Sequence, residues 1–278
     1  SFTDIFYGPK QEAEPAYASQ SYNNRIENSS FTINRKYHLI GMDSYALNAA
    51  EGKVGDTFIV KNSTFNFFTD TYGTFVVRTC ADRVRFENCK LNINLKKQTD
   101  GSSPYCIMSI FAALATKATS PKVELVNTDI EINGAASSSA GRISNPFAYL
   151  FSKIGAKSYS VSLNQCNIHG TARVDWSLFE QMESVSISNS QISIGGCDYH
   201  GYYINAPKRL QITGATFTGR LGKYNTLVSV PNVKDYSHSI DNTTVDASVS
   251  KLFTTSPDRR HTRITNVRNR TTNRPITK

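Results

Sequence analysis

Two carboxylic acids and one imidazole in this chain are spaced for acid–base chemistry. Asp129 and Glu131 stand two residues apart in an alternating stretch, and His169 holds the place of Glu131 one repeat later. Neighbouring strands would set these Cα atoms about 5–7 Å apart. Such spacing suits glycoside hydrolysis, in which carboxyl separations of about 5 to 9.5 Å set the stereochemistry, or another acid–base pair. The alternative is that they are ordinary solvated side chains, because outward strand positions are polar in any case.

A second group combines a carboxylate and an imidazole with aromatic rings. Asp175 and His200 each lie fourteen residues before a repeat boundary, so we expect them to be neighbours on adjacent coils. Rings that stack on sugars and charged groups that bond hydroxyls are what a sugar-binding groove needs. The alternative places the rings in the core or at a subunit interface. The predicted catalytic residues here are Asp175 and His200, and the predicted carbohydrate-binding residues are Trp176, Tyr199, Tyr202, Tyr203, Lys96 and Lys97.

Motifs for cofactors and metals are missing from the sequence. It has no glycine-rich phosphate loop, no His-Glu-x-x-His and no calcium loop of alternating Asp, so we expect neither a cofactor nor a metal. The five cysteines include no Cys-x-x-Cys pair. Cys89 and Cys166 hold a position that Ser and Thr hold in other repeats, which indicates small buried residues and synthesis in a reducing cytosol.

The elements that must position these groups come from a repeated pattern, seen most clearly in Val185–Ile194. Apolar and polar residues alternate up to a corner and then alternate again, which is typical of two short strands with one buried face. A second apolar segment, such as Ile107–Phe111, lies between successive patterns. The corners recur 24 to 39 residues apart, at Asn28, Asn62, Asn88, Asn127, Gln165, Asn189, Gly214, Asn242 and Asn266.

Such a repeat cannot bury its apolar face alone, so its copies must stack. We predict a right-handed parallel β-helix of about nine coils, with a length of about 43 Å at about 4.8 Å per coil. The corner asparagines would point inward as a hydrogen-bonded ladder of amides. The sequons at Asn28, Asn62 and Asn242 fall on this ladder and are therefore interpreted as structural. An antiparallel sandwich is the alternative, but it does not explain why Asn recurs at one phase of the pattern.

The repeat divides the chain into three parts. Residues 1–24 lack it and are predicted to form a cap or anchor segment, residues 25–254 form the β-helix, and residues 255–278 form the last coil and a basic arm. Thr262–Lys278 lose the apolar pattern and are expected to be an exposed arm or an extended tail. Of the net charge of +9, most lies between Lys251 and Lys278, where eight basic residues meet one acid. This favours an acidic partner over nucleic acid, since no aromatic residues are interleaved.

Residues 25–266 resemble the pectate-lyase-like right-handed β-helix superfamily in their stacked patterns, Ser/Thr/Asn-rich outward columns and unpaired cysteines. Within it they look most like bacteriophage tailspikes and capsule depolymerases. The resemblance implies a homotrimeric receptor-binding protein, made in the host cytoplasm and carried on the virion, that recognises bacterial surface polysaccharide. Whether it also cleaves the polysaccharide, as a hydrolase or lyase, is left open, because no catalytic motif of the family matches.

Two other functions are compatible with the sequence. The first is a non-catalytic virion structural, decoration or adhesin protein, tied to other virion proteins by the N-terminal segment or the basic arm. The second is a cell-surface or secreted carbohydrate-active β-helix. Against the second stand the free thiols and the absence of a visible signal peptide at Ser1–Ile5. No apolar run reaches the length of a membrane span, so none is expected.

Overall fold

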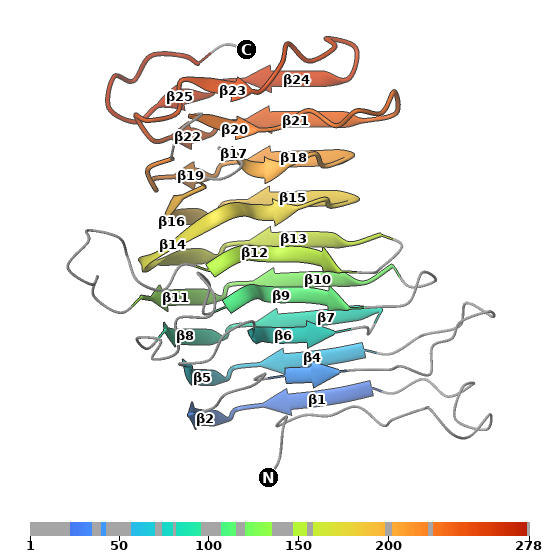
Figure 1. Cartoon of the computed structure of the whole chain (residues 1–278), viewed down its shortest axis with the longest axis vertical. Coiled ribbons are helices and arrows are strands. Elements are labelled where there is room, and N and C mark those ends of the chain that lie inside the picture. The colour runs from blue at the N-terminus through green and yellow to red at the C-terminus, as the bar shows by residue number, and fades with distance from the viewer. Residues whose placement is uncertain are drawn as a thin grey trace.

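The strands stack in a rod, with β1 and β2 at one end and β24 and β25 at the other (Figure 1). The computed structural model describes residues 23–34, 40–42, 57–69, 74–79, 82–95, 107–114, 120–134, 147–154, 158–197, 202–221 and 225–276. These described residues contain strands and no helix. The strands pair in parallel within a 9-stranded and a 16-stranded sheet. The predicted parallel β-helix of about nine coils is therefore confirmed.

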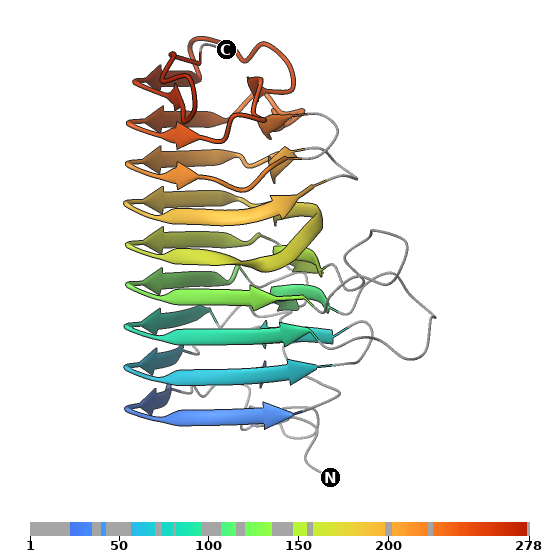
Figure 2. The same cartoon turned by 90° about the vertical axis from the view of Figure 1, so that its left-hand side faces the viewer.

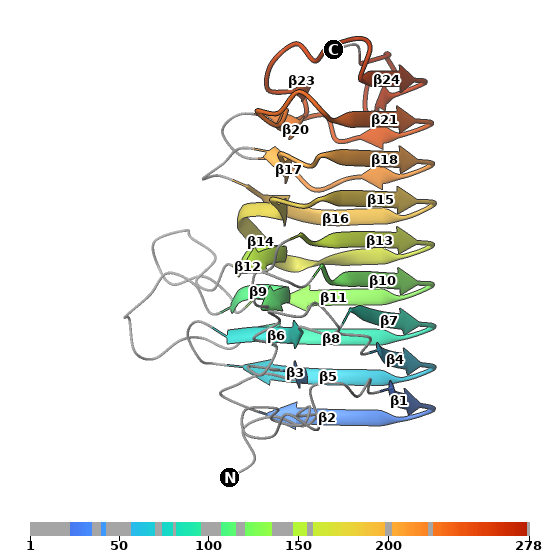
Figure 3. The same ribbon diagram turned by 90° about the vertical axis from the view of Figure 1, so that its right-hand side faces the viewer.

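The coils contribute strands to three faces, except that the last coil has described strands on the first two only (Figures 2 and 3). The first face is the 9-stranded sheet: β1 (Asn23–Glu27), β4 (Thr57–Lys61), β7 (Arg83–Glu87), β10 (Lys122–Val126), β13 (Ser160–Asn164), β15 (Ser184–Ser188), β18 (Arg209–Thr213), β21 (Ser237–Asp241) and β24 (Thr262–Thr265). The second face follows the corners: β2 (Ser30–Asn34), β5 (Thr64–Thr69), β8 (Lys90–Leu95), β11 (Asp129–Asn133), the first part of β14 (Asn167–Glu180), β16 (Gln191–Gly196), β19 (Thr216–Phe217), β22 (Thr244–Val245) and β25 (Arg268–Asn269). The third face holds β3 (Ile40–Met42), β6 (Thr74–Thr79), β9 (Ile107–Leu114), β12 (Phe147–Ile154), the last part of β14, β17 (Tyr202–Asn205), β20 (Thr226–Val228) and β23 (Lys251–Phe253).

One residue in a left-handed backbone conformation turns each coil from the first face to the second. All nine predicted corner positions adopt this conformation, with φ between 44 and 62°. Glycine and asparagine tolerate positive φ best, which explains why they recur at one phase of the repeat. Gln165 is the exception in residue type but has the same φ, 55°. The turn requires positive φ, and this requirement restricts the residue type at the corner. The corner positions could therefore be predicted from the sequence.

The corner amides form the predicted ladder but point outward. Asn62 Nδ2 donates to Asn28 Oδ1 at 3.1 Å, Asn88 Nδ2 to Asn62 Oδ1 at 3.1 Å, and Asn127 Nδ2 to Asn88 Oδ1 at 2.8 Å. All four side chains are exposed, and the small residue after the corner, such as Ser63, is the buried one. The prediction of inward amides is therefore wrong. In the left-handed turn the corner side chain leaves the core, and the next residue enters it.

The core is a continuous stack of the inward strand residues. Phe111 stacks on Phe151 and Phe151 on Phe179, with ring centroids 4.9 and 5.1 Å apart. All three are fully buried on the third face. Aromatic rings in such contact add to the stabilisation from burial alone. The second apolar segment expected in each repeat thus supplies the third face and ties neighbouring coils together.

The C-terminal segment is folded as far as the structure describes it. β24 and β25 pair with β21 and β22. Beyond β25 the chain turns back, with an antiparallel bridge between Arg268 and Pro275, and Ile276 N donates to Val267 O at 2.9 Å. Most of these residues are exposed, as predicted, but they are not an extended tail. Val267 fills the buried position after the corner Asn266, and Ile276, beyond the repeat, packs against the core. The predicted cap or anchor, residues 1–24, lies outside the described residues up to position 22.

Candidate functional site

Asp129, Glu131 and His169 lie together on the outer side of the second face. Asp129 and Glu131 alternate along β11, and His169 on β14 is the Cα partner of Glu131 across the strand pair. The imidazole reaches diagonally, however: Nε2 of His169 lies 3.1 Å from Oδ1 of Asp129. Asn167 Nδ2 donates to the same oxygen at 2.8 Å. The group predicted from spacing is thus brought together, with Asp129 as its hydrogen-bonded centre.

The arrangement is open enough for chemistry. The side chains of Asp129 and His169 are each 34% exposed. Glu131 accepts a hydrogen bond from Asn133 Nδ2 at 3.0 Å. A carboxylate beside an imidazole can accept and pass on a proton, and the second carboxylate on the same face supplies another acceptor. These three residues can therefore bind hydroxyl groups or act as an acid–base group.

A groove of about 390 Å³ includes Asp129 and runs along the corner over four consecutive coils. Its walls are mostly amides and hydroxyls, with one carboxylate and one ammonium. They come from the corner residues, the small residues after them and the first residues of β5, β8, β11 and β14. The lining residues are Asn62, Ser63, Thr64, Asn88, Cys89, Lys90, Asn127, Thr128, Asp129, Gln165 and Asn167. The exposed side of the asparagine ladder is therefore a polar surface with many donors and acceptors.

A glycine positions the strand that carries His169. Gly170 has φ 143°, and a Cβ added there would lie 2.0 Å from the carbonyl oxygen of Ile132. Only glycine allows this close approach of β14 to β11. Directly afterwards the register between β14 and β16 shifts, between His169 and Arg173. β14 therefore continues round the coil, and His169 and Trp176 belong to one strand but to different faces.

The second predicted group is described only in part. Asp175 accepts a hydrogen bond from Arg173 Nη2 at 2.8 Å, and the Trp176 ring meets Tyr149 edge-on, with centroids 5.7 Å apart. Trp176 and Tyr149 are half-buried. The predicted residues His200, Tyr199, Lys96 and Lys97 lie outside the described residues, so the pairing of Asp175 with His200 stays a prediction.

The two remaining tyrosines of that group differ in position. Tyr203 is fully buried, its hydroxyl contacts the carbonyl oxygens of Ile194 and Gly219, and its ring stacks on Phe217. It cannot present its ring to a sugar, which agrees with the core alternative. Tyr202 is half-buried on β17, and burial, with a smaller effect of the Glu180 charge, raises the pKa of its hydroxyl. Tyr202 therefore stays protonated and can donate a hydrogen bond.

Sequence reasoning missed several residues of the surface. Asn167 supplies a direct hydrogen bond to Asp129, and the amides of Asn88 and Asn127 line the groove. Their place in the repeat was visible, but assigning the corners to the interior hid their exposure. Glu180 was also missed: it is 9% exposed and accepts hydrogen bonds from Ser177 and Asn205, both at 2.7 Å. Its burial depends on contacts within the third face, for which the sequence offered no register.

Among the described residues, no three His, Cys, Asp or Glu side chains are placed to hold a metal ion together. The same residues include no helix that is long and apolar enough to cross a membrane. No family model, no curated protein and no solved structure matches this chain.

Proposed function

We propose that this β-helix is a receptor-binding protein that recognises polysaccharide on its second face. The observation that carries the proposal is the polar groove over four consecutive coils. Sugars present hydroxyl groups that donate and accept, and amide side chains do both. Because coils repeat at about 4.8 Å, the same donors and acceptors recur along the rod axis. A chain ligand that runs along the axis would meet them repeatedly.

The resemblance to bacteriophage tailspikes supplies the biological setting of the proposal. The receptor would be bacterial surface polysaccharide, the protein a tail spike or tail fibre component of the virion, and its assembly a homotrimer. The alternative is a non-catalytic virion structural or decoration protein. Sedimentation of the purified protein tests the trimer, and binding to polysaccharide separates the two functions.

Asparagine-to-glycine variants test the groove without straining the corner, because glycine accepts positive φ. The groove variant combines Asn88→Gly with Asn127→Gly. Its control combines Asn242→Gly with Asn266→Gly, the same pair of substitutions, which removes one ladder bond of 2.7 Å at the far end of the rod, against two in the groove variant. Each protein is titrated with purified bacterial capsular and O-chain polysaccharides.

The groove variant should bind about tenfold more weakly than the wild type, since hydrogen bonds contribute about 1 kcal/mol each. The control should bind as the wild type does. Failure of every polysaccharide to bind, or equal losses in both variants, would reject the proposal.

Cleavage is the finer part of the proposal. Asp129, Glu131 and His169 would form its acid–base group, with Asp175 as the candidate on the third face. Reducing-sugar release and the formation of unsaturated products are measured beside binding, so that hydrolase and lyase action are distinguished. If cleavage occurs, Asp129→Asn should abolish it and leave binding measurable. Full cleavage by a variant that replaces Asp129, Glu131 and Asp175 together would exclude these residues.

A further inference from the structure

The arginines of the last coil are a charged feature that polysaccharide binding in the groove leaves unused. Residues 255–276 contain six arginines, no lysine and one acid, Asp258. Among the described residues, only Arg260 of the six forms an ion pair, with Asp258. All six side chains are exposed: Arg259, Arg260, Arg263, Arg268, Arg270 and Arg274. Arg268 also donates hydrogen bonds to Asn266 Oδ1 and to the carbonyl oxygen of Asn273. Within the described residues, the guanidinium groups of Arg259, Arg263, Arg270 and Arg274 are thus available to a partner.

Three of these arginines are carried by a tightly bonded turn, the terminal hairpin (residues 267–276). Asn269 N donates to Arg274 O at 2.9 Å, opposite the bridge between Arg268 and Pro275. The side-chain oxygen of Asn269 accepts two backbone N–H bonds of the turn, at 3.0 and 3.1 Å. Arg268 Nε donates to Asn266 Oδ1 at 2.9 Å. The guanidinium groups are therefore displayed on a fixed backbone, which lowers the entropy lost on binding.

We propose that this end of the rod docks on an acidic surface of another protein, through paired Arg–carboxylate hydrogen bonds. The use of arginine alone favours this partner. The guanidinium fork matches a carboxylate in two parallel bonds, whereas lysine offers a point charge. Interface cores between proteins are likewise enriched in arginine and depleted in lysine.

Two other partners fit less well. Nucleic acid would also pair with arginine, but residues 255–276 contain no Phe, Tyr or Trp on which a base could stack. A second copy of this chain fits less well on its first face, where Glu87, Glu124 and Glu183 are already paired with its own Lys and Arg. We therefore take the partner to be a different protein, and self-association of the wild type in sedimentation would contradict this.

A competing explanation is protection of the sheet edge. β24 is the last strand of the first face and has β21 as its one neighbour in that sheet. Charged side chains on such strands prevent edge-to-edge association, and Arg263 is exposed in the middle of β24. Edge protection needs only charge, however, and would be met by lysine. Binding and self-association must therefore be measured on the same variants.

Point substitutions are the suitable test, because deleting the segment would remove Val267, which is 2% exposed. The first variant changes Arg268, Arg270 and Arg274 to Gln, and the second changes them to Lys. The control changes Lys153, Arg220 and Lys234 to Gln and removes the same charge elsewhere. The probes are poly-L-glutamate and duplex DNA of equal charge, titrated at low and at physiological salt. Circular dichroism and sedimentation report folding and self-association.

The proposal expects poly-L-glutamate to bind more tightly than DNA. The Gln variant should lose about tenfold or more in affinity, the Lys variant should fall between, and the control should match the wild type. Tighter DNA binding, an unchanged Gln variant, or a Lys variant equal to the wild type would overturn it. Self-association of the Gln variant with unchanged poly-L-glutamate binding would assign the arginines to edge protection. None of these outcomes depends on the groove, so this proposal and the proposed polysaccharide binding are tested independently.

Discussion

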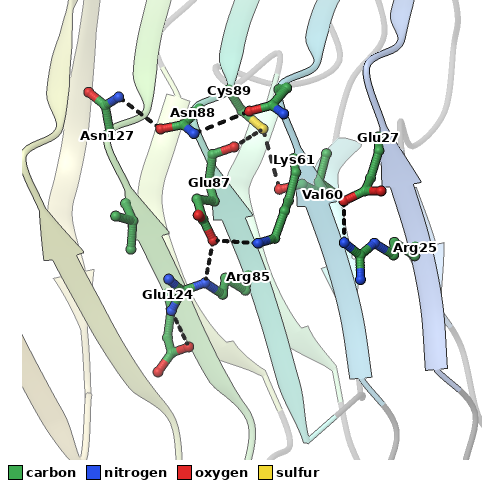
Figure 4. Close-up of polar contacts among 12 residues, drawn as sticks. Arg25, Glu27, Val60, Lys61, Arg85, Glu87, Asn88, Cys89, Glu124 and Asn127 are labelled. Atoms are coloured by element: carbon green, nitrogen blue, oxygen red, sulfur yellow. Dashed lines mark hydrogen bonds and ion pairs between the residues drawn. The ribbon is translucent and has the colours of Figure 1, made fainter.

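Two adjacent regions of the first face have the same interior and different exteriors. On β4, β7 and β10 the outward side chains form a network of ion pairs (Figure 4). Glu87 meets Lys61 and Arg85, both at 3.1 Å, and Glu124 meets Arg85 at 3.4 Å and Lys122 at 2.6 Å. On β13 and β15 the outward positions hold only serine and asparagine, at Ser160, Ser162, Asn164, Ser184, Ser186 and Ser188.

The difference shows that inward residues build the coil and outward residues are free to vary. Leu125 on β10 and Leu163 on β13 are partners in register, and both are fully buried. Their outward neighbours, Glu124 and Ser162, are also partners and have nothing in common chemically. The ionic network is therefore not required for the fold. Four predictions test this comparison.

The largest expected loss of stability comes from truncating a buried core residue, and it should be equal in both regions. Leu125→Ala and Leu163→Ala each remove a fully buried side chain and should each lower the free energy of unfolding by about 2–5 kcal/mol. Denaturant unfolding measures both. A difference between them above about 2 kcal/mol would mean that the ionic network contributes to packing beneath it.

The second largest effect should differ between the outward side chains of the two regions. Glu124→Gln leaves Arg83, Arg85 and Lys122 without their shared carboxylate and should cost about 1–2 kcal/mol at low salt. The cost should shrink as salt is added, because the Arg83 and Lys122 side chains are about half-exposed and their charges are screened, although Glu124 itself is buried. Ser162→Ala is the matched control, with a small and salt-independent effect. Equal effects at all salt concentrations would contradict the distinction.

The third effect is a difference in pH range. Burial lowers the pKa of His238 below 6.5, so its proton binds first to the unfolded state. Stability should therefore fall as pH drops below 6.5, by at most about 1.4 kcal/mol per pH unit. Glu124 acts later: burial would raise its pKa, but hydrogen bonds from Lys122 and Arg83 lower it below 4.5. Its contribution is present above pH 4.5 and is lost as pH falls through the lowered value.

Unfolding titrations from pH 8 to 3 check this order. In a plot of the free energy of unfolding against pH, His238→Phe should reduce the slope just below pH 6.5 and leave the fall below pH 4.5 unchanged. Glu124→Gln should reduce the fall below pH 4.5 and leave the slope just below pH 6.5 unchanged. The phenylalanine ring retains a partner for Phe253, which stacks on the imidazole at 5.9 Å. An unchanged slope below pH 6.5 in the His238 variant would contradict the assignment.

The smallest expected effect belongs to the serine region. Ser186→Ala on β15 removes an outward hydroxyl whose register partner, Ser162, is also serine. We expect a change within about 0.5 kcal/mol, as for most surface substitutions. Thermal unfolding of the two proteins side by side is sufficient. A loss above 1 kcal/mol would show that the serine rows stabilise the sheet.

Much of the candidate site was predictable because the repeat supplies a register. Once Asn127 and Gln165 are aligned as corners, Asp129, Glu131 and His169 must share a face. The diagonal contact between Asp129 and His169 was not predictable, since spacing orders the Cα atoms but not the side-chain torsions. The group around Asp175 was harder still. It lies beyond the shift in register that follows His169, where counting residues no longer gives the neighbour on the next coil.

The sequence by itself determined the number of coils, the positions of their corners and the residues that point inward. Alternating burial and positive φ are local requirements, and each restricts the residue type at fixed positions. Ile192 is an example of an alternately buried residue, and Asn189 of a corner with positive φ. Only the tertiary structure decided which way the corner amides point, and that Ile276 folds the C-terminus onto the last coil. The first depends on the direction in which a side chain leaves the left-handed turn, and the second on a contact between the end of the chain and the core. Both are set by the path of the backbone in space, which the pattern within one repeat does not contain.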